Sequence, residues 1–226
     1  MAWRLRWVVT VPFVVVTTLA TGLVGYLAFR QGQQSVQVVA QQLQGEIAER
    51  VRTELDGFLA PALQLVAINA ELVRQNLIQT QPPRGEIYLW RQMTGQPQLR
   101  VIYFGAATDG RFIGVRRRIE DNSLRLYFNT GQEFILGNQG QRVAQQNVPP
   151  PARRFDSRTR PWYRKALTQD GPIWTDVYVS FSTRRLTITA AQVVKTPQGR
   201  VLGATGADVE LTGLSRFLSG LRIGRS

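Results

Sequence analysis

The apolar positions of the chain follow three patterns in succession. An uninterrupted apolar segment runs from Trp7 to Phe29 and contains no charged residue. From about Gln33 to Gln79, apolar residues recur every three or four positions between Gln, Glu and Arg, which is typical of an amphipathic helix. Beyond Gly85, short apolar runs alternate with polar residues and are separated by turn-forming residues. The pattern therefore predicts a membrane segment, a long helix and a domain rich in strands.

The first segment has the length and the flanking charges of a membrane anchor. As a helix, residues 7–29 would reach about 35 Å, enough to cross a hydrocarbon layer of about 30 Å. Arg4 and Arg6 precede the segment, whereas residues 31–45 carry no charge. Positive residues favour the cytoplasmic side, so we expect residues 1–6 to form a cytoplasmic tail and the remainder to lie in the periplasm or outside the cell. A cleaved signal peptide is the alternative, but its apolar stretch is usually shorter and no small-x-small site clearly follows here. We therefore expect an uncleaved single-pass anchor in the inner or plasma membrane.

The second pattern predicts a long extracytoplasmic helix over residues 30–80. Proline lacks the N–H that the helix ladder needs, so we expect Pro61 to kink this helix or to divide it into two. The apolar stripe indicates either packing on the domain of the same chain or a parallel dimer stalk, and we expect the two in succession, with a homodimer formed through the helix. The sequence "QPPRG", residues 81–85, ends the helical region.

The rest of the chain predicts an α+β domain with a single meandering antiparallel sheet. A short helix over "EIYLWRQM" precedes the strands, a second helix runs from the proline of "RPWY" to about Gln169, and "LTGLSRFLSGL" forms a closing helix. The predicted strands are the runs "RVIYFGA", "RFIGVRRR", "LRLYFNT", "EFILG", "IWTDVYVSFS", "RLTITAAQVVK" and "VLGATGADVEL".

Composition narrows the chemistry. The 226 residues are 43% hydrophobic and 19% charged, which is typical of a packed globular protein. Cysteine and histidine are both absent, which removes thiolate metal sites, cysteine nucleophiles and the commonest general base, so we expect neither catalysis nor a cofactor. The net charge of +13 is high enough for a nucleic-acid-binding protein, but the arginines are spread along the chain, with one cluster at Arg116–Arg118. With the domain expected outside the cytoplasm, we expect no nucleic-acid partner.

The segment "DSRTRPWYRKAL" predicts a fixed corner between an extended stretch and a helix. Arg160 precedes a proline, which disfavours helical backbone there, and Pro161 suits the first turn of a helix. The free N–H groups of that turn and the Arg160 guanidinium favour an anion, of which a carboxylate is the natural small example. Packing alone also explains Trp162, and an ion pair of Arg160 with Asp156 or Asp176 would make the corner a structural clamp. The residues themselves leave these alternatives open.

Three phrases in order carry a resemblance to a known family: "FDSRTRPWYRKAL", "GPIWTDVYVSFSTRRLTITAAQVV" and "GRVLGATGADVELTGLSRFL". Together with the anchor and the long helix, they resemble the membrane-distal module of a double Cache (dCache) sensor domain, the extracytoplasmic ligand-binding unit of bacterial receptors. The resemblance implies a PAS-like antiparallel sheet with flanking helices over residues 81–218 and a non-catalytic role in sensing a small molecule. The closing "LRIGRS" resembles the entry into the membrane-proximal module, so residues 219–226 are expected to begin that module. Family members continue into a histidine kinase, a nucleotide cyclase or a chemoreceptor signalling part, none of which is expected in these residues.

The resemblance also implies a binding site. In amino-acid-binding members, the arginine and tryptophan of the corner hold the ligand carboxylate, and an aspartate after the last strand takes the amine. These residues correspond here to Arg160, Trp162 and Asp208, while Tyr163 and Tyr178 match aromatic positions that line the pocket. A guanidinium and an indole N–H donate to a carboxylate, and a carboxylate accepts from an ammonium, so the assignment is chemically consistent.

Two positions depart from the pattern of the amino-acid-binding members. Phe155 stands where those members usually have a tyrosine, and Ser180 stands where an aspartate is common. The expected partner is therefore a small metabolite, which leaves amino acids, other carboxylates and related amines open.

Two other classes of function also remain open. An exported enzyme would use Asp208, Asp176 or Glu210 as acid and base, and it requires two carboxylates in one cleft. A membrane-tethered structural or assembly protein would depend on its stalk and would have a vestigial pocket. Binding without turnover distinguishes a sensor from an enzyme, and the absence of any ligand would favour the assembly protein.

Overall fold

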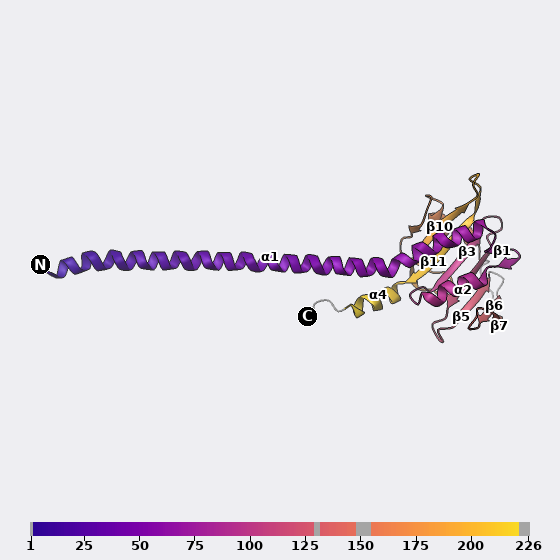
Figure 1. Ribbon diagram of the computed structural model, residues 1–226, viewed down its shortest axis with the longest axis horizontal. Helices are drawn as coiled ribbons and strands as arrows, with labels where there is room; N and C mark the ends of the chain where they lie inside the picture. The colour runs from indigo at the N-terminus through magenta and orange to yellow at the C-terminus, as the bar shows by residue number, and fades with distance from the viewer. Residues whose placement is uncertain (1, 129–131, 148–154, 222–226) are drawn as a thin grey trace. The chain divides into compact units, whose positions relative to one another are not determined.

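The computed structural model describes residues 2–128, 132–147 and 155–221 (Figure 1). The chain divides into two compact units, and the boundary between them falls after Thr53, inside the first helix. The second unit begins at Glu54 and contains all of the strands, so the sheet and the candidate site belong to this unit alone.

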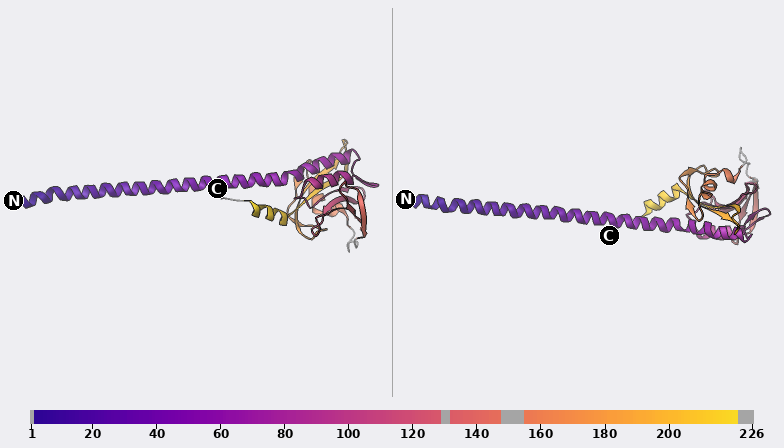
Figure 2. Two further views of the ribbon diagram at one scale, coloured as in Figure 1. Left: turned by 60° about the horizontal axis from the view of Figure 1, so that its bottom comes forward. Right: turned by 90° about the horizontal axis from the view of Figure 1, so that it is seen from above.

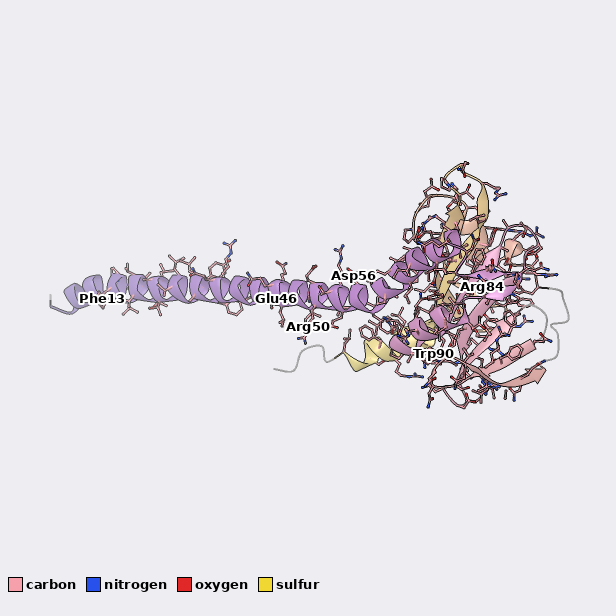
Figure 3. The ribbon with its side chains drawn as sticks, turned by 45° about the vertical axis from the view of Figure 1, so that its right-hand side comes forward. Phe13, Glu46, Arg50, Asp56, Arg84 and Trp90 are labelled. Atoms are coloured by element: carbon pink, nitrogen blue, oxygen red, sulfur yellow. The ribbon has the colours of Figure 1, made fainter. Side chains whose placement is uncertain are left out.

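The first unit is the N-terminal part of helix α1, which extends from Ala2 to Arg74. The side chains from Val11 to Phe29 are exposed, and most are apolar; Phe13 is one of them (Figure 3). The hydroxyl groups of Thr17, Thr18 and Thr21 each donate to the carbonyl four residues earlier at 2.7 to 2.8 Å, which satisfies them inside the helix. By length and composition, Val11–Gln31 is able to cross a membrane.

The part of α1 after Thr53 behaves as a core helix. Gln41–Arg74 also passes the length and composition criterion for a membrane span, but a third of its apolar window is buried. Ala62, Val66 and Ala70 are fully buried in the core of the second unit. Burial of these turns therefore explains the apolar stripe of this segment.

The structure decides between the two alternatives for Pro61 and corrects the end of the long helix. Division at Pro61 is wrong, because α1 is continuous from Ala2 to Arg74; the turns that follow Pro61 are held by the core, and this burial offsets the cost of one lost backbone hydrogen bond. The helix also ends at Arg74 and not near residue 80. Asn76 adopts left-handed backbone with φ of 57°, and the N–H of Leu77 donates to the carbonyl of Leu72 at 2.8 Å, which is a Schellman termination with asparagine in the place of glycine.

A large antiparallel sheet forms the centre of the second unit. Its strand order is β7-β6-β5-β4-β3-β11-β10-β8, and the short strand β9 also pairs with β10. The first five strands form a meander, but β11 returns to pair with β3, so the expected simple meander is wrong at this point. The strand bounds are β3 Val101–Ala106, β4 Phe112–Arg117, β5 Leu124–Phe128, β6 Gln132–Leu136, β7 Arg142–Asn147, β8 Ile173–Trp174, β9 Tyr178–Val179, β10 Leu186–Lys195 and β11 Val201–Glu210.

The two faces of the sheet are covered by different elements (Figure 2). The last turns of α1 and helix α2, Glu86–Gly95, cover one face, where the main core forms around Ile102, Ile113 and Leu126. Successive strand residues point to opposite faces, so Val101, Tyr103 and Phe112 face the other side. There they pack against helix α3, Pro161–Ala166, in a second apolar cluster. This second face is the one that carries the candidate site.

The remaining elements are short. Strands β1, Gln79–Thr80, and β2, Pro83–Arg84, pair in a small separate sheet, and helix α4, Leu211–Gly220, follows β11 as expected. Strand β7 was not expected, and "IWTDVYVSFS" forms two short strands, β8 and β9, instead of one. Helix α3 ends at Ala166, three residues before the expected end. Residues 222–226, in the expected start of the membrane-proximal module, lie outside the described residues.

Candidate ligand-binding site

The predicted corner is present, and it is fixed by local hydrogen bonds. A 3-10 turn over Ser157–Thr159 leads into Arg160, whose φ of −83° and ψ of 149° are extended, and Pro161 is the first residue of α3. The side chain of Asp156 caps the turn by accepting from the N–H of Arg158 at 2.9 Å. The buried hydroxyl of Ser157 donates to the carbonyl of Gly110 at 3.0 Å and so anchors the corner to the β3–β4 turn.

Arg160 lies among aromatic rings and makes no ion pair with the residues that the structure describes. Its guanidinium carbon is 4.9 Å from the ring centre of Phe155 and 4.2 Å from that of Phe181. Burial lowers the pKa of Arg160, although the nearby charge of Asp156 opposes this effect. Within the described residues, its one hydrogen bond is a long one of 3.3 Å from Nε to the carbonyl of Asp156. The two terminal nitrogens of the fork therefore keep their donor capacity.

The clamp alternative for Arg160 is not supported by the partners of the two candidate acids. Asp156 pairs with Arg158 at 2.8 Å. Asp176 lies 3.9 Å from Lys165, and its side chain is 98% exposed. Neither acid neutralises Arg160, so the charge at the corner remains available for an anion.

Asp208 is a buried carboxylate near the end of β11. It is 4% exposed, and its Oδ1 accepts from the hydroxyls of Tyr103 and Thr189, both at 2.7 Å. Burial raises the pKa of Asp208 to about 6; the hydrogen bonds from Thr189 and Tyr103 oppose this rise, and the charge of Glu210 adds to it. Both of these hydrogen bonds go to one oxygen, so within the part of the chain that the structure describes Oδ2 keeps the capacity to accept from a further donor.

Tyr103 joins the corner to Asp208. Its ring centre lies 4.6 Å from that of Trp162, and its hydroxyl donates to Asp208. The ring lies over Gly206, where an added Cβ would be 2.6 Å from Cζ of Tyr103. An added Cβ at Gly114 would be 2.8 Å from the Cβ of Tyr103. The glycines are therefore required here because the ring packs directly on the sheet. Through this ring, the structure brings Trp162 and Asp208 together on one face.

The other expected site residues surround the same cluster. Tyr163 is 3% exposed and packs against Trp162, with ring centres 5.4 Å apart. Tyr178 is half-buried, and its hydroxyl shares a 2.7 Å hydrogen bond with Thr189. Phe155 contacts the ring of Phe112 at 4.8 Å. Ser180 is buried, and its hydroxyl faces that of Ser182 at 3.3 Å, so it lies in the turn after β9.

Three residues of this cluster were not singled out by sequence reasoning: Tyr103, Thr189 and Phe181. Tyr103 and Thr189 hold the acid, and Phe181 covers the guanidinium of Arg160. The alternation along "RVIYFGA" and "RLTITAAQVVK" was the available signal, because it places Tyr103 and Thr189 on the face opposite the main core.

The carboxylates proposed for an enzyme are only partly brought together. Asp208 and Glu210 are both buried and, two residues apart on β11, point to the same face. The Oε1 atom of Glu210 lies 3.2 Å from Nε of Arg100. Asp176 is exposed next to Lys165 and does not join the two buried acids. The arrangement therefore places a donor fork, an aromatic wall and an acceptor on one face of the sheet.

Comparison with known proteins identifies the same class of domain. Residues 126–216, less than half of the chain, match the family model of a methyl-accepting chemotaxis protein-like, first PDC sensor domain. Over 67 residues, the chain is 36% identical to the methyl-accepting chemotaxis protein PscA of Pseudomonas syringae pv. tomato. This alignment covers 30% of this chain and 10% of that protein.

Solved structures show the fold. The ligand-binding domain of the Pseudomonas fluorescens chemoreceptor CtaA, in complex with L-alanine, matches with a TM-score of 0.54 and 21% identity over 78% of this chain and 62% of that one. The corresponding domain of the Campylobacter jejuni chemoreceptor Tlp3, in complex with L-valine, matches with a TM-score of 0.52 and 13% identity over 80% of this chain and 64% of that one.

These findings confirm the resemblance to double Cache sensor domains and the α+β, PAS-like fold. The chain has the fold of a receptor's small-molecule sensing module. It spans less than two thirds of the two ligand-binding domains, and its alignment with PscA covers about a tenth of that protein.

Proposed function

We propose that this chain is the extracytoplasmic sensing module of a membrane-anchored receptor and that it binds a small molecule bearing both a carboxylate and an ammonium group. The observation that carries the proposal is the combination, among the described residues, of Arg160, a guanidinium without a carboxylate partner, with Asp208, a buried carboxylate whose Oδ2 accepts no hydrogen bond. The chemoreceptor domains of similar fold include one in complex with L-alanine, a molecule with these two groups.

The chemistry of the two ends supports this assignment. The fork of Arg160 presents parallel N–H donors that match the geometry of a carboxylate. The Oδ2 atom of Asp208 accepts from an ammonium, and the positive charge of the ligand compensates the desolvated carboxylate. Trp162, Tyr103 and Tyr178 supply the apolar wall between these ends. A zwitterionic amino acid therefore satisfies both ends at once.

The proposed placement in the cell follows from α1. Residues 7–29 cross the membrane once, residues 1–6 lie in the cytoplasm, and the helix up to Arg74 leads to the sensor module in the periplasm or outside the cell. Two copies pair through the exposed part of this helix, and the module acts by binding and not by catalysis. The support is the exposed apolar segment Val11–Gln31 and the similarity to chemoreceptors.

Titration of the full chain in detergent with single L-amino acids tests the proposal, with heat and melting temperature as readouts. Alanine, valine and serine represent small side chains, and glutamate represents acidic ones. A binding amino acid should stabilise the fold, and so raise the melting temperature, with the logarithm of one plus its concentration over Kd. Arg160→Ala and Asp208→Asn should each remove this rise, because each deletes the partner of one charged end. Arg164→Ala is the matched control for Arg160, because it removes an exposed arginine of α3.

The outcomes separate the candidate functions. If no amino acid, amine or organic acid shifts the melting temperature of the parent chain, the sensing function is wrong and an assembly role gains support. If a bound amino acid is converted, the module is an enzyme. If Arg164→Ala removes binding as fully as Arg160→Ala does, the corner is not the carboxylate site.

A further inference from the structure

A tight turn after β9 brings a second arginine into the aromatic shell of Arg160. The N–H of Ser180 donates to the carbonyl of Arg185 at 2.9 Å, and the N–H of Arg184 donates to the carbonyl of Ser180 at 3.0 Å. Arg184 has a φ of 57°, the left-handed region that long side chains rarely occupy. Unfavourable backbone that is held by its surroundings concentrates at binding sites, which makes this turn a candidate part of the site.

The ring of Phe181 lies next to two guanidinium groups. Its centre is 4.2 Å from the guanidinium carbon of Arg160 and 5.6 Å from that of Arg184. Phe155 contacts Phe181, with ring centres 5.4 Å apart, and also lies beneath Arg160. Two cations thus share one aromatic surface, although like charges repel each other unless an anion lies nearby.

The described residues supply no anion for this pair of arginines. Asp156 is bound by Arg158, and Glu210 lies between Arg100 at 3.2 Å and Arg185 at 4.0 Å. Neither Arg160 nor Arg184 has an ion pair within the parts of the chain that the structure describes. The same turn also contains the hydroxyl of Thr183, which is buried and has no hydrogen-bond partner there.

We propose that Arg184 is a second anion-binding position and that the ligand carries a second acidic group, as an acidic amino acid does. The inference rests on the proposed function, in which Arg160 holds the main carboxylate and Asp208 the ammonium. The side-chain carboxylate then lies at the turn, against Arg184 and the hydroxyl of Thr183.

Matched pairs of ligands test the proposal on the full chain in detergent. L-Glutamate and L-glutamine have nearly the same shape and differ in one negative charge, as do L-aspartate and L-asparagine. Calorimetric titration should show tighter binding of the acidic member of at least one pair. Because Arg184 is exposed, its contribution is moderate, and Arg184→Gln should weaken binding of that acidic member about fivefold. Binding of the amide member should stay unchanged.

Two further variants separate charge from geometry. Arg200→Gln removes the same charge from the β10–β11 turn and should leave the preference for the acidic ligand intact. Arg184→Lys should keep part of the preference, because it retains the charge but loses the planar fork. The proposal is overturned if the amide binds as well as the acid, or if Arg184→Gln and Arg200→Gln have the same effect. In either case a retained dependence on Arg160 would leave the sensing function standing, whereas loss of all amino-acid binding would overturn both.

Discussion

The buried, ionised carboxylate of Asp208 should lower the free energy of unfolding of the ligand-free protein. Its pKa rises from an ordinary value of 3.8 to about 6 because the side chain is buried. The folded protein therefore binds a proton more tightly than the unfolded chain does, and stability falls as pH rises from about 4 to 6. A difference of about two pH units, at about 1.4 kcal/mol per unit, corresponds to about 3 kcal/mol lost above pH 6.

Asp208→Asn should remove this loss. The amide oxygen of asparagine still accepts from Tyr103 and Thr189, and the side chain has no charge to desolvate. The free energy of unfolding of the ligand-free variant should therefore exceed that of the parent by up to about 3 kcal/mol at pH 7.5 and by little at pH 4.

Urea unfolding of the full chain in detergent, followed by tryptophan fluorescence at several pH values, measures the difference. A variant that is less stable than the parent at pH 7.5, or a difference that does not change between pH 4 and 7.5, would refute the reasoning. The same carboxylate predicts the pH dependence of ligand affinity. An ammonium binds the ionised form, so affinity should decline as pH falls below about 6.

Three other changes test the packing around the site. Gly206→Ala should cost about 1–3 kcal/mol of unfolding free energy, because the added methyl overlaps the ring of Tyr103; thermal unfolding measures it, and an unchanged melting temperature would contradict the close approach. Tyr103→Phe should move the pH dependence of stability to higher pH, because the hydrogen bond from Tyr103 lowers the pKa of Asp208 and its removal raises that pKa; a shift to lower pH would be inconsistent. Arg116→Met should destabilise the chain by about 3 kcal/mol, because Glu133 loses its 2.7 Å partner while buried; a double variant with Glu133→Leu should recover most of the loss.

Much of the fold could be predicted because its central strands are apolar runs bounded by turn-forming residues. "RVIYFGA", "RLTITAAQVVK" and "VLGATGADVEL" each place apolar residues where the structure has a strand between two covered faces. Strand β7 could not be found this way, since "RVAQQN" lies at the edge of the sheet and its polar residues give no alternating pattern. The end of α1 depended on a single asparagine in left-handed backbone, which pattern alone does not locate.

The candidate site could be predicted only as far as local sequence determines it. The bend at Arg160 and Pro161 follows from the proline, and the structure has it. The link between Trp162 and Asp208 depends on Tyr103, which is distant from both in sequence and is brought there by the pairing of β3 with β11. Register between distant strands is set by the whole sheet, so "RVIYFGA" indicates the face on which Tyr103 lies but not the residues that it contacts. The ligand contacts of the seven site residues stay a prediction.

Strand β11 ends at Glu210, and α4 begins at the next residue, Leu211. No loop residue separates the two elements, so a displacement of β11 along its own axis should also move α4. The ring of Phe217 in α4 stacks on that of Phe58 in α1, with ring centres 4.4 Å apart. The Phe58–Phe217 contact therefore links the helix that follows the strand of Asp208 to α1, and Phe217→Ala should weaken this link.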